Sequence, residues 1–218
     1  MNTVSDYWYE KKSIPSDERL RIKDSVKGES AGEFVICGVP HKLVRTDGQT
    51  FRDVFAANRP FLYKGDHTAP PDENDYSDAF NYLSDDGLAG FSVSRSGWLT
   101  SLYSNYDEPG FAGEVKKYVT ALAYKLVCIA ADTYKNNRLV SLYEREYGFR
   151  KYVTTVDDTE VMREYYGEEF IKAFTARNGT PFHVFMIGPD TVAANNDILH
   201  FEDYFEAEAY VEKTVKRM

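Results

Sequence analysis

The stretch L-A-G-F-S-V-S-R-S-G-W-L-T-S-L-Y-S-N, residues 88–105, decides the fold class. Apolar and polar residues alternate on both sides of Ser96-Gly97, a dipeptide that favours a tight turn. Alternation with a period of two is typical of a strand with one buried face. The stretch therefore predicts an antiparallel β-hairpin, and we expect this hairpin to lie in a central sheet.

The segments after the hairpin alternate between helical and strand patterns. Val115, Tyr118, Val119 and Leu122 recur at helical spacing, which predicts a helix over about 114–126. The further expected elements are a strand over 127–131, a helix over 137–146 ended by Gly148, a strand over 149–155, a helix over 160–177 and a strand over 181–188. This order predicts an α/β (α+β) fold with a mixed central sheet and helices on both of its faces.

The regions at the two ends of the chain complete a three-part division. Residues 1–32 are polar without a sustained apolar period, and we interpret them as an N-terminal arm that is partly helical and ordered only against the domain or a partner. Residues 33–190 form the expected domain, and 191–218 the expected C-terminal amphipathic helix, with Phe201, Tyr204, Val211 and Val215 at helical spacing. Within the domain, 34–37 and 42–45 flank Gly-Val-Pro and predict a hairpin, Thr50 is the expected helix cap, and Pro60 is expected to break that helix.

Residues 66–86 are the main irregular stretch, with seven acids, no Lys or Arg, and Pro70-Pro71. We interpret the stretch as an acidic surface loop. A rim for a cationic substrate is the functional alternative. The formal net charge of -9 argues against a generic nucleic-acid binder, which needs a basic surface.

The cysteines, the histidines and the apolar runs limit the class of protein further. Cys37 and Cys128 sit in apolar runs and are expected to be buried, inert thiols. The four histidines are scattered, so no metal site is expected from spacing. No apolar run approaches the roughly 18 residues of a membrane span, and the N-terminus lacks the apolar core of a signal peptide. A cytoplasmic protein without a membrane segment is expected, and the sequence leaves oligomerisation open.

The segment N-R-L-V-S-L-Y-E-R-E-Y-G-F, residues 137–149, carries the most specific motif. Asn137, Tyr143 and Gly148-Phe149 follow a hairpin, a glycine-containing turn, a helix and a strand, in that order. This arrangement resembles that of the GNAT superfamily of acyl-CoA-dependent N-acyltransferases. The resemblance implies a sheet whose fourth and fifth strands are parallel and splay apart, with acetyl-CoA or another acyl-CoA held between them.

The resemblance also implies roles for individual residues. Main-chain groups of Leu102 and Tyr103 would pair with the pantetheine arm, and Asn137 would bind its amide region. Tyr143 would protonate the departing thiolate as a general acid; the alternative is an aromatic packing residue. The general base stays open among Asp132, Glu108 and an acid of 66–86, and the catalytic prediction names Tyr143 and Asp132.

The turn expected to bind the cofactor's pyrophosphate reads D-E-P-G-F-A-G-E, residues 107–114. The residues expected to contact the cofactor there are Gly110, Phe111, Ala112 and Gly113, whose N–H groups would meet the phosphates. Asp107 stands where the family has Gln or Arg, and Glu108 and Pro109 follow it. An acidic loop-to-helix junction without a ligand is the alternative interpretation of this turn.

These observations predict an N-acetyltransferase in which an amine attacks the thioester carbonyl directly. The acceptor would be an amine-bearing small molecule or protein. The alternative is a non-catalytic GNAT-like module that binds a protein partner. Transfer to a nucleic acid is a third interpretation, which the net charge disfavours, although Lys116, Lys117 and Lys125 would supply a local basic patch.

Overall fold

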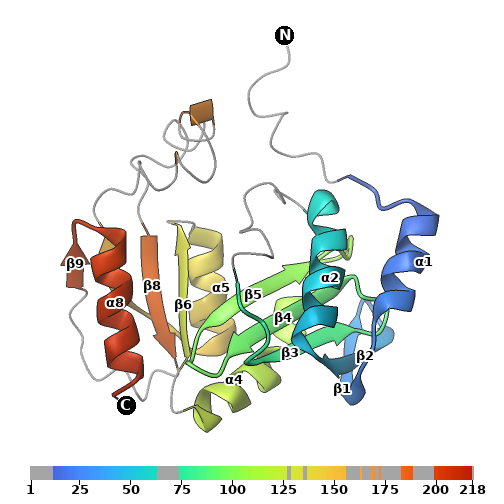
Figure 1. Cartoon of the computed structure of the whole chain (residues 1–218), viewed down its shortest axis with the longest axis horizontal. Coiled ribbons are helices and arrows are strands. Elements are labelled where there is room, and N and C mark those ends of the chain that lie inside the picture. The colour runs from blue at the N-terminus through green and yellow to red at the C-terminus, as the bar shows by residue number, and fades with distance from the viewer. Residues whose placement is uncertain are drawn as a thin grey trace. The chain divides into compact units, whose positions relative to one another are not determined.

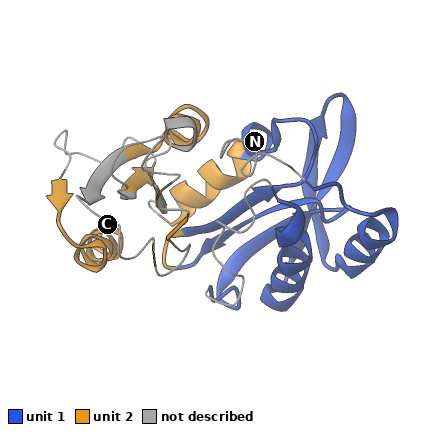
Figure 2. Ribbon diagram, turned by 90° about the horizontal axis from the view of Figure 1, so that it is seen from above, with its two compact units in different colours: residues 1–95, 99–115 blue, residues 96–98, 116–218 orange. Residues whose placement is uncertain are grey.

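The computed structural model describes residues 12–62, 74–126, 129–134, 137–155, 183–188 and 199–217, with isolated positions between 163 and 172. The side chains of 132–139, 151–155 and 183 lie outside that description. Contacts divide the chain into two compact units, coloured separately in Figure 2. Unit 1 comprises residues 1–95 and 99–115, and unit 2 comprises 96–98 and 116–218.

Unit 1 contains a five-stranded antiparallel sheet in the order β1-β2-β3-β4-β5 (Figure 1). Its strands are β1 (Glu29–Ile36), β2 (Val39–Thr46), β3 (Ala79–Ser84), β4 (Ala89–Ser94) and β5 (Leu99–Ser104). Each strand pairs with the next one along the chain. The hairpin predicted from residues 88–105 is confirmed as β4 and β5. The single mixed sheet expected from the sequence was wrong, because β5 belongs to this antiparallel sheet while the strand that begins at Ile129 belongs to a second sheet.

The β1–β2 hairpin turns at a different place from the predicted one. Cys37 and Gly38 have φ angles of 47° and 80°, so the tight turn uses these two residues and not Gly-Val-Pro. Positive φ at both central positions matches the right-handed twist of the flanking strands. The Cys37 side chain is exposed, and the expectation of a buried thiol was wrong for this residue because it occupies the hairpin tip.

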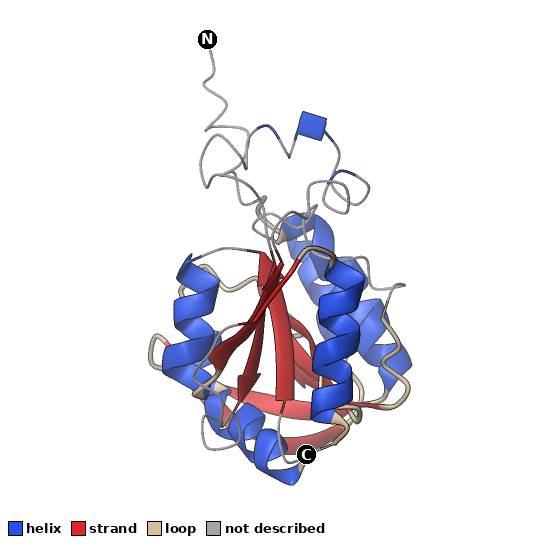
Figure 3. Cartoon of the chain, turned by 90° about the vertical axis from the view of Figure 1, so that its left-hand side faces the viewer, coloured by secondary structure: helices blue, strands red, loops and turns tan. Residues whose placement is uncertain are grey.

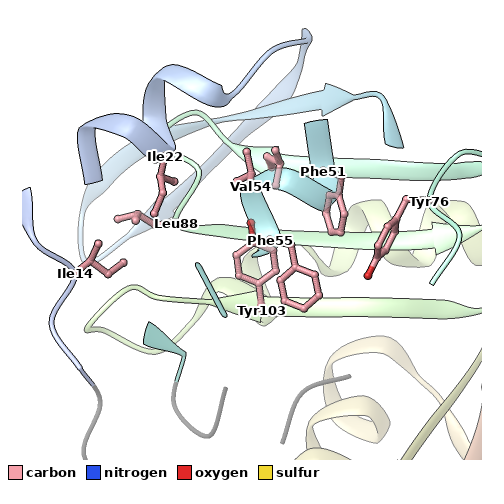
Figure 4. Close-up of a cluster of buried hydrophobic side chains, with 9 residues drawn as sticks. Ile14, Ile22, Phe51, Val54, Phe55, Tyr76, Leu88 and Tyr103 are labelled. Carbon is pink, nitrogen blue, oxygen red and sulfur yellow. The ribbon is translucent and has the colours of Figure 1, made fainter. Parts of the chain in front are cut away.

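The helix α2 packs against the unit 1 sheet, and α1 packs against α2 (Figure 4). The helix α1 (Ser16–Ser25) buries Ile22, and α2 (Gly48–Asn58) buries Phe51, Val54 and Phe55. The core cluster around them contains Ile14, Ile22, Phe51, Val54, Phe55, Tyr76, Leu83, Leu88 and Tyr103. Residues 12–32, which the sequence assigned to a polar arm, therefore include a core-packed helix and the start of β1. The apolar period is weak because only one side chain of α1 is buried.

The ends of α2 follow local chemistry. Asp47, not Thr50, is the cap: its carboxylate accepts hydrogen bonds from the N–H and the hydroxyl of Thr50, both at 2.8 Å. The prediction was three residues late because Thr50 is the donor of the capping bond, not its acceptor. Pro60 lies in the 3-10 turn η2 (Arg59–Phe61) that follows the helix, which confirms the expected break.

The stretch 66–86 is not a loop throughout. Residues 79–84 form β3, in which Phe80 and Leu83 are buried, while residues 63–73 lie outside the described part of the chain. The six residues of this strand, A-F-N-Y-L-S, carry no charge. The sequence predicted a loop here because the residues on either side of the strand are acidic.

Unit 2 contains a four-stranded sheet in the order β6-β8-β7-β9. Its elements are α4 (Lys116–Lys125), β6 (Ile129–Tyr134), α5 (Asn137–Tyr147), β7 (Arg150–Thr155), β8 (His183–Gly188), β9 (Leu199–Phe201) and α8 (Tyr204–Val215). The strand β8 is antiparallel to both β6 and β7, whereas β7 and β9 are parallel. The predicted strands and the C-terminal helix are confirmed within this unit, but Phe201, which was expected in that helix, lies in β9, a strand that was not foreseen.

Helices lie on both faces of the unit 2 sheet (Figures 1 and 3). Phe185 and Ile187 pack with Ala207 and Val211 of α8. Because side chains alternate along a strand, Gly188 faces the other side, where it meets Phe149 next to α5. The helix predicted over 160–177 lies outside the described residues, apart from isolated positions.

Gly97 and Trp98, which belong to unit 2, join β6 through a parallel bridge. Trp98 pairs with Ala130, and the Ala130 N–H donates to the Gly97 carbonyl at 2.7 Å.

The predicted helix over 114–126 is interrupted: α3 (Phe111–Glu114) ends before Val115, and α4 follows it. Among the described helices, none combines the length and the apolar character that crossing a bilayer requires.

Candidate functional site

The strand β5 lies at the edge of the unit 1 sheet and carries the first predicted cofactor groups. The Asn105 N–H donates to the Leu88 carbonyl at 2.8 Å, and residues opposite each other alternate between bonded and non-bonded pairs. Tyr103, two positions earlier, therefore directs its main chain towards Gly90 of β4. The main-chain groups of Leu102 face away from β4, on the side where no strand of the described residues pairs with β5.

Tyr103 is not placed as the resemblance implied. Its main chain is used by the sheet, and its ring stacks on Phe55 at 4.9 Å in the core. Its hydroxyl donates to the Gly87 carbonyl at 3.3 Å, and burial raises the pKa of this tyrosine well above its ordinary value. Tyr103 is therefore a packing residue of unit 1, and the cofactor-binding role of Leu102 stays a prediction.

The glycine-containing turn leads into α3, a single helical turn. Gly110 has a φ of 130° and precedes Phe111, whose buried ring meets Phe34 edge-on at 5.3 Å. The Val35 N–H donates to the Glu114 carboxylate at 3.1 Å. Phe111 is thus a core anchor, and α3 is shorter than the helix the sequence predicted to follow this turn. Ala112 and Gly113 lie within α3.

The helix α5 places Tyr143 in an aromatic group of unit 2. The Tyr143 ring lies 6.0 Å from that of Tyr147 and 6.2 Å from that of Phe149. Gly148 takes a φ of 65°, and the Phe149 N–H donates to the Tyr143 carbonyl at 3.1 Å. The Gly-Phe pair of the motif therefore ends α5 and anchors its last turn, because a positive φ favours glycine.

Burial shapes the chemistry of this aromatic group. Tyr143 is 9% exposed and Tyr147 is 2% exposed. Burial, with smaller effects from Tyr143 and Glu146, raises the pKa of Tyr147 above its ordinary value. Tyr147 therefore stays protonated at neutral pH. Asn137 begins α5 and Asp132 lies in β6 opposite Phe185, but the side chains of both lie outside the described residues.

A second group of polar side chains, which the sequence did not predict, lies in unit 1. His41, Asp85, Asp86 and Tyr106 form this group, which we call the His41 cluster. The Tyr106 hydroxyl lies 3.1 Å from Nδ1 of His41 and donates to the Asp86 carboxylate at 2.9 Å. Nδ1 of His41 is 3.6 Å from an Asp86 oxygen and 3.9 Å from an Asp85 oxygen.

The register of β2 and β3 creates the His41 cluster. Leu43 lies opposite Ser84, and the Asp85 N–H donates to the Lys42 carbonyl at 2.9 Å, so the next pair outward is His41 and Asp86. Burial and the Asp86 charge raise the pKa of Tyr106 far above its ordinary value. Tyr106 is therefore a fixed hydrogen-bond donor and not a titrating acid near neutral pH.

A pocket of about 270 Å³ opens beside this cluster. Ile36, Val39 and Leu88 supply apolar lining, and Asp86, Asp107 and Glu108 supply carboxylates. Arg19 lines it as well. Asp107 and Glu108 of the predicted phosphate turn thus border an acidic pocket, which suits a cation better than a phosphate.

No protein-family model, curated protein or solved structure matches the chain.

Proposed function

We propose that this chain is an acyl-CoA-dependent N-acyltransferase of the GNAT type, which transfers an acetyl group to an amine. The observation that carries the proposal is the parallel bridge between Trp98 and Ala130 at the point where the chain enters β5. The order of elements after it, with helix, strand β6, helix α5 and then Gly148-Phe149, is the order that the resemblance requires.

The proposed reaction forms a C–N bond and breaks a C–S bond. The acceptor amine attacks the thioester carbonyl directly, and the carbonyl oxygen is polarised by main-chain N–H groups. The Tyr143 hydroxyl gives its proton to the departing thiolate, and a base, for which Asp132 is the candidate, takes the proton of the amine. The coenzyme supplies the activated acyl group, and Asn137 is the proposed partner of its pantetheine amide.

A second candidate function is a GNAT-like module without catalysis that binds a protein partner. The specific observation in its favour is the acidic turn: Asp107 and Glu108 are exposed and border the unit 1 pocket. Two carboxylates there repel a pyrophosphate. In addition, α3 has only one turn. Its helix dipole is therefore small, and its N-terminus attracts a phosphate only weakly.

Calorimetry and thiol release with acetyl-CoA separate the two functions. Wild type, Tyr143→Phe and Asp107→Arg are titrated with acetyl-CoA and assayed against polyamines, amino acids and lysine peptides. If the chain is the proposed enzyme, Tyr143→Phe keeps cofactor affinity and loses turnover by about 10²-fold or more. Asp107→Arg tightens cofactor binding, since a repulsion is removed and a phosphate partner is added.

Each of these measurements has a result that would contradict part of the proposed function. Turnover that survives intact in Tyr143→Phe would remove the general-acid role from this tyrosine. Unchanged or weaker affinity of Asp107→Arg would contradict the placement of the phosphate turn. Wild-type protein that neither binds acetyl-CoA nor releases thiol would leave the partner-binding module as the function, with Tyr143 as a packing residue.

A further inference from the structure

We infer that unit 1 binds a divalent metal ion through His41, Asp85 and Asp86, and that Zn²⁺ is the preferred ion. One ligand atom from each of these side chains lies within 4.8 Å of the others. An imidazole nitrogen with two carboxylate oxygens is a ligand set that suits Zn²⁺. Tyr143 and Asp132, the residues proposed to move protons in acyl transfer, are not part of this site, and the inference does not rest on the proposed function.

The two distances from His41 fit an ion of this kind. Two ligands that are each about 2.1 Å from one ion can lie at most about 4.2 Å from each other. Nδ1 of His41 is 3.6 Å from the Asp86 oxygen and 3.9 Å from the Asp85 oxygen, so both pairs already satisfy that limit. The side chains of His41 and Asp86 are 16% and 26% exposed, which gives the ion partial shielding with a route of entry.

Neighbouring groups hold the three ligands in place. The Asp86 Oδ1 atom accepts hydrogen bonds from the Ser84 hydroxyl at 2.6 Å and from the Leu88 N–H at 3.1 Å. Asp86 Oδ2, the oxygen nearer to His41, accepts from Tyr106 at 3.1 Å. Such partners orient a metal ligand and reduce the reorganisation needed on binding.

The other two ligands are fixed in the same manner. The Lys42 N–H donates to Asp85 Oδ1 at 3.2 Å, and the Asp85 N–H is fixed by the Lys42 carbonyl. The His41 ring stacks on Phe34 at 5.3 Å with an interplanar angle of 15°. The sheet and the ring stack therefore bring the three side chains together, and an ion bound at Nδ1 of His41 takes the place of the proton on Nδ1 and of its contact with the Tyr106 hydroxyl at 3.1 Å.

The surrounding charge favours a cation. Asp85 and Asp86 are neighbours in the chain, and the adjoining pocket adds the carboxylates of Asp107 and Glu108. A divalent ion offsets the repulsion among these groups. Three protein ligands also leave at least one position of a four-coordinate ion for water or another small molecule from the pocket.

The test is a calorimetric titration of the full chain with Zn²⁺ after removal of metal with a chelator. Wild type is expected to bind one Zn²⁺ ion per chain. His41→Phe keeps the stacked ring and removes the nitrogen, while Asp85→Asn keeps an acceptor for the Lys42 N–H and removes the charge. Each is expected to lose affinity by about 10-fold or more, because one of three ligands is lost or weakened. Circular dichroism verifies that the variants are folded.

Asp107→Asn and Glu108→Gln are the matched controls, since both border the same pocket outside the ligand set. Each is expected to change affinity by less than about threefold, the effect of a nearby screened charge. Equal losses in controls and ligand variants would overturn the site in favour of a general acidic attraction. Absence of Zn²⁺ binding, or equal binding in wild type and both ligand variants, would overturn it as well.

A measurement on wild type alone guards against a variant that does not fold. Zn²⁺ titrated into labelled protein is expected to shift the imidazole resonances of His41 at one equivalent, ahead of those of the other histidines. Zn²⁺ that binds while the His41 resonances stay unchanged would overturn the assignment. Mn²⁺ and Mg²⁺ run in parallel measure selectivity, and weaker binding of Mg²⁺ is expected because Mg²⁺ favours oxygen ligands over nitrogen.

Discussion

The two units build their sheets in different ways. In unit 1 each of the five strands pairs with its neighbour along the chain, so the sheet is a succession of antiparallel pairs. In unit 2 the strand β8 enters between β6 and β7, which precede it in the sequence, and β9 is added in parallel. Sequential pairing leaves a local signal in the sequence, whereas insertion of a later strand depends on contacts between distant segments.

The difference extends to how each sheet is covered. In unit 1 the aromatic residues of α2 reach the sheet face that carries Leu83 and Tyr103. In unit 2, α8 covers one sheet face, and a glycine in β8 makes room for an aromatic ring on the other. The packing of unit 1 therefore depends on large side chains that fill the core. The packing of unit 2 also depends on Gly188, whose lack of a side chain leaves room for the ring of Phe149.

The largest expected effect tests the filled core of unit 1. Phe55 is 1% exposed and stacks on Tyr103. Phe55→Ala is expected to lower the free energy of unfolding by about 3–5 kcal/mol, since it removes buried apolar area and leaves a cavity. Denaturant unfolding measures the loss, and hydrogen exchange shows where protection is lost.

If the two units unfold separately, exchange in Phe55→Ala accelerates in β3, β4 and β5 while β6 and β8 keep their protection. Phe185→Ala, in the fully buried core of unit 2, is the matched variant and should give the reverse pattern. Equal acceleration in both units with either variant would contradict a division into two stability units and point to one cooperative fold.

The next effect tests the space kept by glycine in unit 2. A Cβ atom at Gly188 would overlap the ring of Phe149. Gly188→Ala is therefore expected to destabilise the protein by about 1–3 kcal/mol, the range for overpacking a tight core. Thermal unfolding at matched conditions provides the measurement.

The double variant Gly188→Ala with Phe149→Leu distinguishes overlap from other causes. A smaller side chain at 149 relieves the clash, so the two changes together should cost less than the sum of their separate effects. Simple additivity would show that the alanine acts through the strand backbone and not through the aromatic ring.

The smallest effect concerns the start of α2. Asp47→Ala removes the carboxylate that accepts from Thr50 and is expected to cost about 1 kcal/mol of unfolding free energy. Asp53→Ala is the control, because Asp53 is exposed on the same helix away from its cap and should change stability by less than about 0.5 kcal/mol.

The pH dependence of this effect has a fixed sign. The hydrogen bonds from Thr50 lower the pKa of Asp47 below its ordinary value. The folded state therefore binds the proton less tightly than the unfolded state, so the cap contributes fully above about pH 4 and loses its effect as pH falls through the folded pKa. A destabilisation by Asp47→Ala that persists undiminished in strong acid would contradict this account.

Local chemistry in the sequence determined much of the secondary structure. The alternation around Ser96-Gly97 gave the β4–β5 hairpin, Pro60 ended α2, and Gly148 ended α5, each within a few residues of the chain. These features depend on short-range properties: the period of two in a strand, the missing N–H of proline and the freedom of glycine at positive φ. The strand β3 was missed because its acidic neighbours outweighed six uncharged residues.

Only the tertiary structure determined which polar and titratable side chains lie close together and which are buried in the core. Tyr103 belongs to the core and not to an open edge because of the register of β4 and β5, which a shift by one residue would invert. The His41 cluster arises because pairing of β2 with β3 brings His41 to Asp86 across 45 positions of sequence. No spacing rule covers such a separation, since the distance between two strands in the chain depends on the helix and loop that connect them.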